Sequence, residues 1–323
     1  NPFEILGEQF IEKMKNGELV NRYLSDVSAE LKQALADYVG FGIKPEQILF
    51  GNGADEMLYY LFTAVRDDNN SFAISLAPSY FDYKTYSGSV GLKIHQLPLN
   101  EDFNFSIEDY IQYLRDPHCK LAILCNPNNP TGHMIPDKKI IHVLQNTDIP
   151  VIVDETYFEY SGKTFADMIS EYPNLIIVRS FSKSFSAAGL RFGYIISSAE
   201  NCFEINKVIP VFHSNLMTQA FALTMLENKE VFQKHNLKTI ERRNALFEQM
   251  SKIKGLIVRN THTNFLIFSA GERSKDLYEH FLANDISVRP VWAHPVLANY
   301  LRVSISSDED NNAFYQALKQ FME

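Results

Sequence analysis

Lys183 stands in the segment of the sequence whose residue types best suit covalent chemistry. Ser180 and Ser182 precede it, and Arg191 follows it after a run of small residues. A cationic neighbour and partial burial lower the pKa of a lysine and free its amine to attack a carbonyl carbon. The guanidinium and the two hydroxyls suit the oxygens of a phosphate group. The segment therefore predicts a Schiff-base lysine beside a phosphate site, with a solvated surface lysine as the alternative.

Asp154 directly follows the apolar run Val151–Val153. A carboxylate at the end of a buried strand can hold a protonated ring nitrogen, because an opposite charge nearby favours the charged form. Tyr157 lies one turn further on and could contact the same ligand. An aspartate that caps the next turn, or one that binds Mg²⁺, would give the same pattern, so both alternatives stay open.

Two turns rich in glycine or proline follow other apolar runs. Residues 51–56 read Gly-Asn-Gly-Ala-Asp-Glu, and the amides of Gly53, Ala54 and Asp55 would form a helix N-terminus that binds phosphate. Residues 126–132 read Asn-Pro-Asn-Asn-Pro-Thr-Gly, a stiff turn that could hold Asn129 to donate a hydrogen bond to a phenolic oxygen. An ordinary strand-to-helix turn and a plain loop are the alternatives for these two segments.

The elements that must position these residues alternate between short apolar runs and amphipathic helices. We predict helices over 28–39, 54–65, 107–114 and 136–145, and strands over 48–50, 72–76, 92–99, 121–125, 151–153, 175–178 and 194–196. This alternation is typical of βαβ units and predicts an α/β fold, a three-layer α/β/α domain with a mostly parallel sheet. Ligands of such sheets bind outside the carboxyl ends of the strands, which is where the candidate residues lie.

A change of pattern after about residue 201 indicates a second, smaller α/β domain. Long helices are predicted over 215–250, with Arg242 and Arg243 on a solvated face, and strands over 256–258, 265–268, 288–291 and 301–305. We therefore predict a large domain over 26–225 and a small domain over 226–323. Residues 1–25 are expected to form an N-terminal arm that packs on the small domain or on a partner subunit.

Composition narrows the classes of protein to which the chain can belong. Its 323 residues carry a formal net charge of −9, which gives no support to nucleic-acid binding. The three cysteines show no paired spacing, so we expect no disulfide framework, no metal site and a cytoplasmic location. No apolar run approaches the roughly 20 residues that span a bilayer, and no signal peptide is recognisable.

Taken in this order, the four segments resemble those of the fold-type I enzymes that use pyridoxal 5′-phosphate, in the class I and II aminotransferase group. The most specific part of the resemblance runs from Ser180 to Tyr194, with Ser-x-Ser-Lys followed by Gly-Leu-Arg-x-Gly-Tyr. The resemblance covers nearly the whole chain and is strongest to the branch that acts on histidinol phosphate. It implies a homodimeric enzyme with this cofactor.

The resemblance also implies a role for each candidate residue. Lys183 would form the covalent bond with the cofactor aldehyde and carry the proton, while Asp154 would pair with the pyridinium nitrogen. Asn129 and Tyr157 would bind the phenolic oxygen of the cofactor. Thr156 stands where these enzymes usually carry alanine. The cofactor phosphate would be held by residues of two segments, namely Gly53, Ala54, Asp55, Ser180, Ser182 and Arg191.

Aromatic and basic residues outside the four segments extend the resemblance. Tyr83 matches the aromatic residue that stacks on the cofactor ring, with Tyr80 as its nearby competitor and ordinary packing as the alternative for both. Tyr23 matches a tyrosine that reaches the phosphate in the neighbouring subunit, and a surface tyrosine is its alternative. Arg302 and Arg289 match two arginines that bind the anionic group of the substrate. A strand-end salt bridge is the alternative for Arg289.

The activity that the resemblance implies is transamination of histidinol phosphate with 2-oxoglutarate, in two half-reactions with ping-pong kinetics. A lyase similar to threonine-phosphate decarboxylase and an aromatic or broad-specificity aminotransferase are the enzymatic alternatives. A binding or regulatory protein that keeps the fold without the chemistry is less favoured, because Lys183, Asp154 and Arg191 each serve a bound cofactor.

Overall fold

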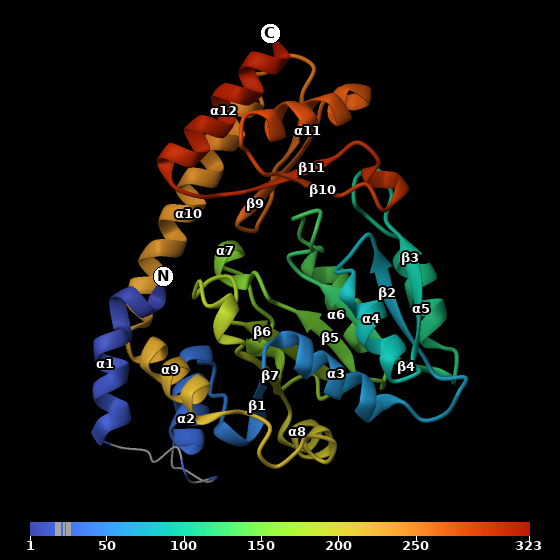
Figure 1. Ribbon diagram of the computed structural model, residues 1–323. Coiled ribbons are helices and arrows are strands. Elements are labelled where there is room, and N and C mark those ends of the chain that lie inside the picture. Colours follow the sequence, from blue (N-terminus) through green and yellow to red (C-terminus); the bar gives the residue numbers. More distant parts are fainter. Residues whose placement is uncertain (17–20, 22, 24–26) are drawn as a thin grey trace.

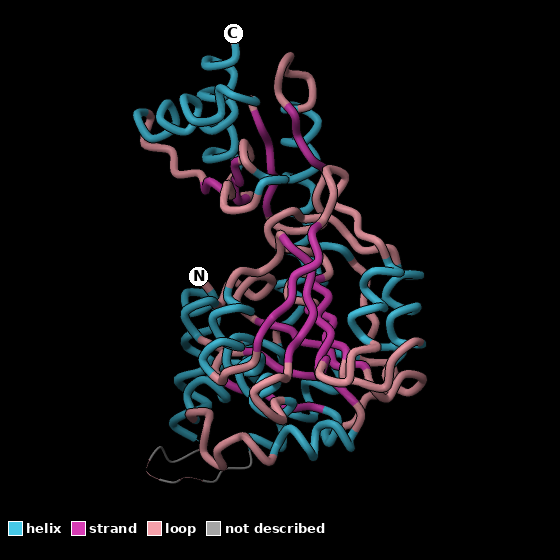
Figure 2. The backbone as a smooth tube through the Cα atoms, turned by 90° about the vertical axis from the view of Figure 1, so that its right-hand side faces the viewer, coloured by secondary structure: helices cyan, strands magenta, loops and turns pink. Residues whose placement is uncertain are grey.

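The protein is built from two parts, each with its own sheet (Figure 1). The computed structural model describes residues 1–16, 21, 23 and 27–323. The larger part, below in Figure 1, surrounds a seven-stranded sheet, and the smaller part above it carries a four-stranded sheet. Figure 2 shows the strands of the larger sheet crossing the centre of the lower part. In the part of the chain so described, no helix combines the length and the apolar character needed to cross a membrane.

The seven-stranded sheet is mostly parallel, as predicted. Its strands are β1 (Ile48–Gly51), β2 (Phe72–Ala77), β3 (Lys93–Pro98), β4 (Cys119–Cys125), β5 (Val151–Asp154), β6 (Leu175–Ser180) and β7 (Gly193–Ser197). They lie in the order β1-β7-β6-β5-β4-β2-β3. β7 runs in the opposite direction to the other six strands of this sheet, since it pairs antiparallel with β1 and β6 while the other pairs are parallel.

Helices cover both faces of this sheet because its strands are apolar on both sides. In β4, Leu121 and Ile123 join one buried cluster while Ala122 and Leu124 join the other. One face is covered by α2 (Val27–Val39), α5 (Ile107–Leu114), α6 (Asp137–Gln145) and α9 (Leu216–Glu227). The opposite face is covered by α3 (Ala54–Val65), α4 (Asp82–Ser89) and α8 (Ala199–Asn206). The three-layer α/β/α architecture is therefore confirmed.

The smaller part packs helices against an antiparallel sheet with the order β10-β11-β9-β8. Its strands are β8 (Ile257–Arg259), β9 (Phe265–Ser269), β10 (Arg289–Pro290) and β11 (Leu301–Ser304). Its helices are α10 (Lys229–Met250), α11 (Ser274–Ala283) and α12 (Asp308–Met322). Phe268, Phe281 and Phe314 form the centre of its core.

The prediction of a solvated face for both Arg242 and Arg243 is wrong for the second residue. Arg242 pairs with Asp308, whose side chain is exposed. Arg243 is buried, and its guanidinium donates a hydrogen bond to the carbonyl of Thr263. Neighbouring residues of a helix point in directions about 100° apart, so one can face solvent while the next faces the loop before β9.

The N-terminal helix α1 (Pro2–Asn16) packs on α9 rather than on the four-stranded sheet. Phe10 contacts Phe221 with their ring centroids 5.1 Å apart, and Lys13 pairs with Glu227 at 2.7 Å. The apolar stripe of α1 thus joins the core of the larger part, and Lys13 reaches the start of the predicted small domain at Glu227. Packing of the arm on a partner subunit stays a prediction. Residues 17–20, 22 and 24–25 of the predicted arm lie outside the described residues.

Candidate active site

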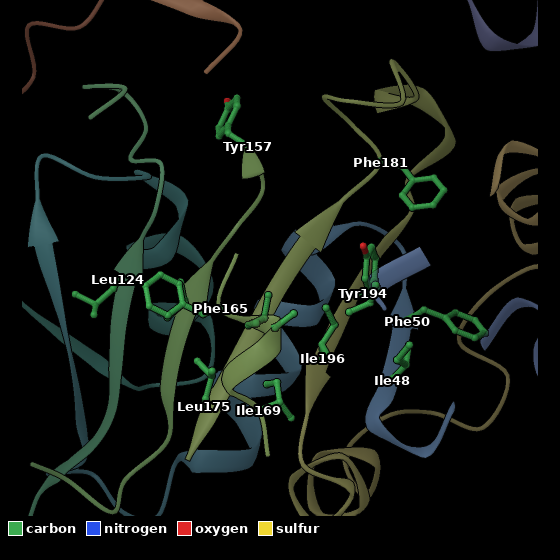
Figure 3. Close-up of a cluster of buried hydrophobic side chains, with 14 of the residues drawn as sticks. Ile48, Phe50, Leu124, Tyr157, Phe165, Ile169, Leu175, Phe181, Tyr194 and Ile196 are labelled. Atoms are coloured by element: carbon green, nitrogen blue, oxygen red, sulfur yellow. The ribbon is translucent and has the colours of Figure 1, made fainter. Parts of the chain in front are cut away.

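A cavity of about 230 Å³ opens at the carboxyl ends of β4, β5 and β6, beside the N-terminus of α3. The parallel sheet brings residues from distant parts of the chain to this edge, as expected for an α/β fold. In Figure 3, Tyr157 lies beyond the end of its strand, at the rim of the buried cluster. Predicted residues from all four segments line the cavity, namely Ala54, Asp55, Asn129, Asp154, Tyr157, Ser180, Ser182, Lys183 and Arg191.

Lys183 lies partly buried in the turn after β6 and lines this cavity. Burial lowers the pKa of its amine, and the positive charges of Arg302 and Arg191 lower it further. Its Nζ lies 5.9 Å from the ring centroid of Tyr157. A lower pKa leaves more of the amine neutral, and a neutral amine is the form that attacks a carbonyl carbon.

Asp154 ends β5 as a buried carboxylate at the floor of the cavity. Its Oδ2 accepts a hydrogen bond from Tyr83 at 2.5 Å, and its Oδ1 accepts from both the backbone and the hydroxyl of Thr156. Burial raises the pKa of Asp154, and no basic side chain of the described residues forms an ion pair with it. The donor set therefore fits a ligand that brings a cationic nitrogen to this carboxylate.

The opposite end of the cavity is suited to an anion. The N-terminus of α3 exposes the amides of Ala54 and Asp55 there, and Ser180 and Ser182 add hydroxyls. Arg191 donates from Nη2 to Oδ2 of Asp55 at 2.7 Å, which fixes the guanidinium beside the helix end. Gly53 does not line the cavity itself.

Gly53 and Gly193 let the anion-binding end of the cavity close tightly. Gly193 is not among the site residues predicted from the sequence. Gly53 has a φ of +90°, which favours glycine, and it lies against the guanidinium of Arg191. A Cβ added to Gly193 would meet the backbone of Gly53 and Ala54. Gly193 follows Arg191 by two residues, so the Arg-x-Gly pattern was the available signal.

Gly193→Ala is expected to destabilise the protein by about 1–3 kcal/mol, because the new methyl group must displace the backbone at the start of α3. The same displacement should weaken anion binding at that helix end. Urea unfolding of the ligand-free protein measures the first effect, and titration with inorganic phosphate measures the second. Gly189→Ala is the matched control, because nothing lies within 4 Å of the added carbon there. Equal behaviour of the two variants would contradict this explanation.

The two tyrosines that competed for the ring-stacking position lie in different places. Tyr80 lines the cavity and donates a hydrogen bond to Asp55 at 3.0 Å. Tyr83 is only 1% exposed and lies behind the cavity wall, where its hydroxyl is held by Asp154. The geometry favours Tyr80 over Tyr83 as the aromatic residue that contacts a ligand ring.

A second, more open cavity continues from the first toward the smaller part and is lined by residues of both sheets. Arg302 on β11 donates from Nη1 to Oδ1 of Asn129 at 2.8 Å, and its guanidinium lies 4.9 Å from the ring centroid of Phe265. Arg289 pairs with Arg302 in the register of β10 and β11 and is itself exposed. The structure therefore brings both predicted arginines to one cavity that also borders Lys183.

Tyr23 lies outside both cavities. It is 84% exposed and stacks on Phe212, with the ring centroids 4.6 Å apart. Its predicted contact with a neighbouring subunit stays a prediction. Its sequence neighbour Arg22 lies outside the described residues.

The described residues contain no group of three or more histidine, cysteine, aspartate or glutamate side chains that could hold a metal ion. His133, near the Asn129 turn, is largely buried, and burial lowers its pKa to about 4. Its Nδ1 instead lies 2.6 Å from the hydroxyl of Thr131, so it takes part in the hydrogen bonds of that turn.

The fold and the site together define a class of enzyme, and comparison with known proteins gives that class a name. The family model described as "Aminotransferase class I and II" matches residues 5–318. The chain belongs to this family and is an aminotransferase.

Particular relatives share a single name. The histidinol-phosphate aminotransferase of Clostridium novyi (strain NT) is 33% identical over 299 residues, which cover 93% of this chain and 83% of the relative. Among solved structures, the histidinol-phosphate aminotransferase from Clostridium acetobutylicum matches with a TM-score of 0.86 at 25% identity, covering 99% of this chain and 95% of that one. The enzyme of the same name from Sinorhizobium meliloti, solved in complex with pyridoxal-5′-phosphate, matches with a TM-score of 0.85 at 21% identity, covering 97% and 85%.

Proposed function

We propose that this chain is a pyridoxal-phosphate-dependent aminotransferase that acts on histidinol phosphate, with 2-oxoglutarate as the amino acceptor. The single observation that supports it most is the sharing of one cavity by Lys183, Asp154 and Arg191. They offer an amine, a buried carboxylate and a guanidinium, and these complement the aldehyde, the ring nitrogen and the phosphate of this cofactor. The family and the name of its relatives agree with the proposal.

Each residue has a defined task toward the cofactor. Arg191 and the amides at the start of α3 hold the phosphate, and Asp154 holds the proton on the ring nitrogen. Pyridoxal phosphate, when bound, supplies a ring that accepts the electron pair left when a bond to the substrate α-carbon breaks. Lys183 then serves as the base that moves the proton, because its lowered pKa leaves more of its amine neutral than in an ordinary lysine. Tyr80 forms the side of the slot that receives the ring.

Arg302 and Arg289 are proposed to bind the anionic group of the substrate. Burial lowers the pKa of Arg302, and Arg289 adds to that effect, so an anion between the two guanidinium groups would be strongly favoured. The same pair would accept the phosphate of histidinol phosphate and a carboxylate of glutamate in turn. Asn129, held by Arg302, presents its amide toward the cofactor phenolic oxygen with Tyr157.

The proposed substrate is tested by mixing the cofactor-loaded protein with one amino compound at a time. Histidinol phosphate and glutamate are each expected to convert the bound cofactor to its amine form, seen as loss of the visible absorption band. Phenylalanine should react more slowly, because it has no phosphate for the two arginines. Release of CO₂ from threonine phosphate, with the band retained, would instead identify a decarboxylating lyase. A fastest reaction with phenylalanine would identify an aromatic aminotransferase.

We also propose that the protein is a cytoplasmic homodimer. The exposed stack of Tyr23 on Phe212 and the exposed Val211 form an apolar surface of the kind that association buries. A molar mass near 37 kDa in light scattering, the mass of one chain, would contradict the dimer.

A further inference from the structure

Tyr83 is the only phenol among the described residues that donates a hydrogen bond to Asp154. Its side chain is 1% exposed, and it lies at the start of α4, behind the cavity wall. The distance of 2.5 Å between its Oη and Oδ2 of Asp154 is typical of a charge-assisted O–H···O⁻ bond. Thr156 supplies the other two donors, both to Oδ1, so each carboxylate oxygen is fixed from a different element.

The segment that carries Tyr80 and Tyr83 connects the two ends of the cavity. The ring of Tyr83 meets the ring of Tyr80 edge to face, with their centroids 5.3 Å apart and an interplanar angle of 84°. Tyr80 donates to Oδ1 of Asp55, whose Oδ2 accepts from Arg191. A continuous series of contacts thus runs from the carboxylate at the ring-nitrogen end to the guanidinium at the phosphate end.

We infer that Tyr83 is a positioning residue for Asp154, which orients the carboxylate and keeps it ionised so that the cofactor ring nitrogen retains its proton. This inference rests on the proposed function, because it concerns the same cofactor. The physical reason is a competition for one proton between the buried carboxylate and the ring nitrogen. A hydrogen bond donated to the charged carboxylate stabilises that form, and therefore leaves the proton on the nitrogen.

The other groups around Asp154 do not replace this donor. Burial raises the pKa of Asp154, and the negative charge of Asp55 on α3 raises it further, while the hydrogen bonds from Tyr83 and Thr156 lower it. The thiol of Cys125 at the end of β4 is buried there too, and burial raises its pKa. Lys183 borders the same cavity, but it has a covalent role in the proposed function. Removing the phenol hydroxyl therefore shifts the balance toward a protonated carboxylate.

Tyr83→Phe tests the inference, because it removes only the hydroxyl and keeps the ring packed against Tyr80. The readout is the ¹⁵N chemical shift of ring-labelled pyridoxal phosphate bound at neutral pH. The parent should show a protonated ring nitrogen, and the variant should show a larger neutral fraction. We also expect cofactor affinity to fall roughly 10-fold or more, the effect of losing one hydrogen bond to a charged group.

Tyr110→Phe is the matched control. Tyr110 is also fully buried, and its hydroxyl bonds to the backbone of Ile74 and Ile123 rather than to a carboxylate. It should lose stability as any buried phenol does, without any change in the ¹⁵N shift. Tyr83→His is the second variant, which keeps a ring donor toward Asp154 and is expected to restore the protonated nitrogen. If Tyr83→Phe does not fold, a neutral ring nitrogen in a folded Tyr83→His would by itself overturn the inference, because the donor to Asp154 is kept in that variant.

The outcomes separate this inference from the proposed function. If the parent protein binds no labelled cofactor, the proposed function fails and the inference fails with it. If the parent binds the cofactor with a protonated ring nitrogen, and a folded Tyr83→Phe gives the same shift and affinity, only the inference is overturned. A neutral ring nitrogen in both Tyr83→Phe and a folded Tyr83→His would also overturn it, because a donor would then not suffice.

Discussion

Lys183→Ala is expected to lose aminotransferase activity by roughly 10,000-fold or more, the upper end of what one proton-transfer group contributes, while the protein stays folded. The loss follows because the alanine methyl group can neither bond to the cofactor nor carry a proton. Cofactor binding through the phosphate and ring-nitrogen contacts should persist, although more weakly. Steady-state rates, together with far-ultraviolet circular dichroism, measure the two parts of this prediction.

The fold should survive for an electrostatic reason. Burial and the nearby arginines lower the pKa of Lys183, so the folded state binds its proton less well than the unfolded state does. A lysine with a lowered pKa costs stability in full at pH values below that pKa, and the cost disappears as the pH rises from the lowered pKa to the ordinary pKa of lysine. Removing the amine removes the cost. Ligand-free Lys183→Ala should therefore be at least as stable as the parent at neutral pH.

A surface lysine provides the control for this experiment. Lys163 pairs with Asp137 at 3.0 Å, and both side chains are about half exposed. Exposed ion pairs of this kind contribute about 0–1 kcal/mol, so Lys163→Ala should retain parental activity and nearly parental stability. Borohydride reduction followed by peptide mapping gives an independent check. If the added mass of the cofactor lies on a peptide without Lys183, the assignment is wrong.

The strand ends of the cavity could be predicted because buried parallel strands are short apolar runs and the chemistry follows directly after them. Asp154 and Lys183 were identified in this way, and β5 and β6 indeed end beside them. The bounds of α3 and α5 also agree with prediction, since both helices carry apolar residues at helical spacing on one face.

The helix α4 could not be predicted on the same grounds. Its sequence, Asp-Tyr-Lys-Thr-Tyr-Ser-Gly-Ser, has no continuous apolar face, and only Tyr83 and Ser87 in it are buried. The relative positions of Tyr80 and Tyr83 depend on tertiary contacts of this segment, such as the hydrogen bond from Tyr83 to Asp154 at the end of β5. The resemblance therefore gave two candidates for the ring contact, and nothing in the sequence connected Tyr83 with Asp154.

Contacts between the two parts of the protein were also beyond the sequence. Arg302 and Asn129 are separated by 173 positions, and each could be assigned a ligand role only by itself. The hydrogen bond between them joins the arginine that is proposed to bind substrate to the turn that is proposed to hold the cofactor. A local pattern predicts the residue type needed at a site, whereas a bond of this kind requires β11 to lie beside the turn that follows β4.

Asp154→Asn is expected to lower kcat by roughly 100- to 1,000-fold, the effect of removing one partner from a buried charge pair. The amide has nearly the shape of the carboxylate and can keep the hydrogen bonds to Thr156. It carries no negative charge, however, so it cannot hold a proton on the cofactor ring nitrogen. A neutral ring withdraws electrons less strongly from the substrate α-carbon. Single-turnover half-reactions with glutamate measure this step without product release.

The ligand-free form of the same variant should behave in the opposite way. Burial raises the pKa of Asp154, so the folded protein holds that proton more tightly than the unfolded chain does. Its contribution to stability is fully present below the usual pKa of an aspartate and is lost as the pH rises through the raised value. Asparagine stays neutral throughout. Ligand-free Asp154→Asn should therefore match the parent at acidic pH and exceed its stability at alkaline pH, in urea unfolding measured across that range.

Asp137→Asn is the control, because Asp137 is half exposed and its partner Lys163 lies at the surface. It should change neither the half-reaction rate nor the dependence of stability on pH.

The two properties of Asp154→Asn are linked by one cause, since the charge that costs stability in the empty cavity is the charge that the cofactor nitrogen neutralises. A variant that loses activity but shows the parental pH dependence would separate them. In that case the catalytic loss would have to come from altered geometry rather than from the missing charge.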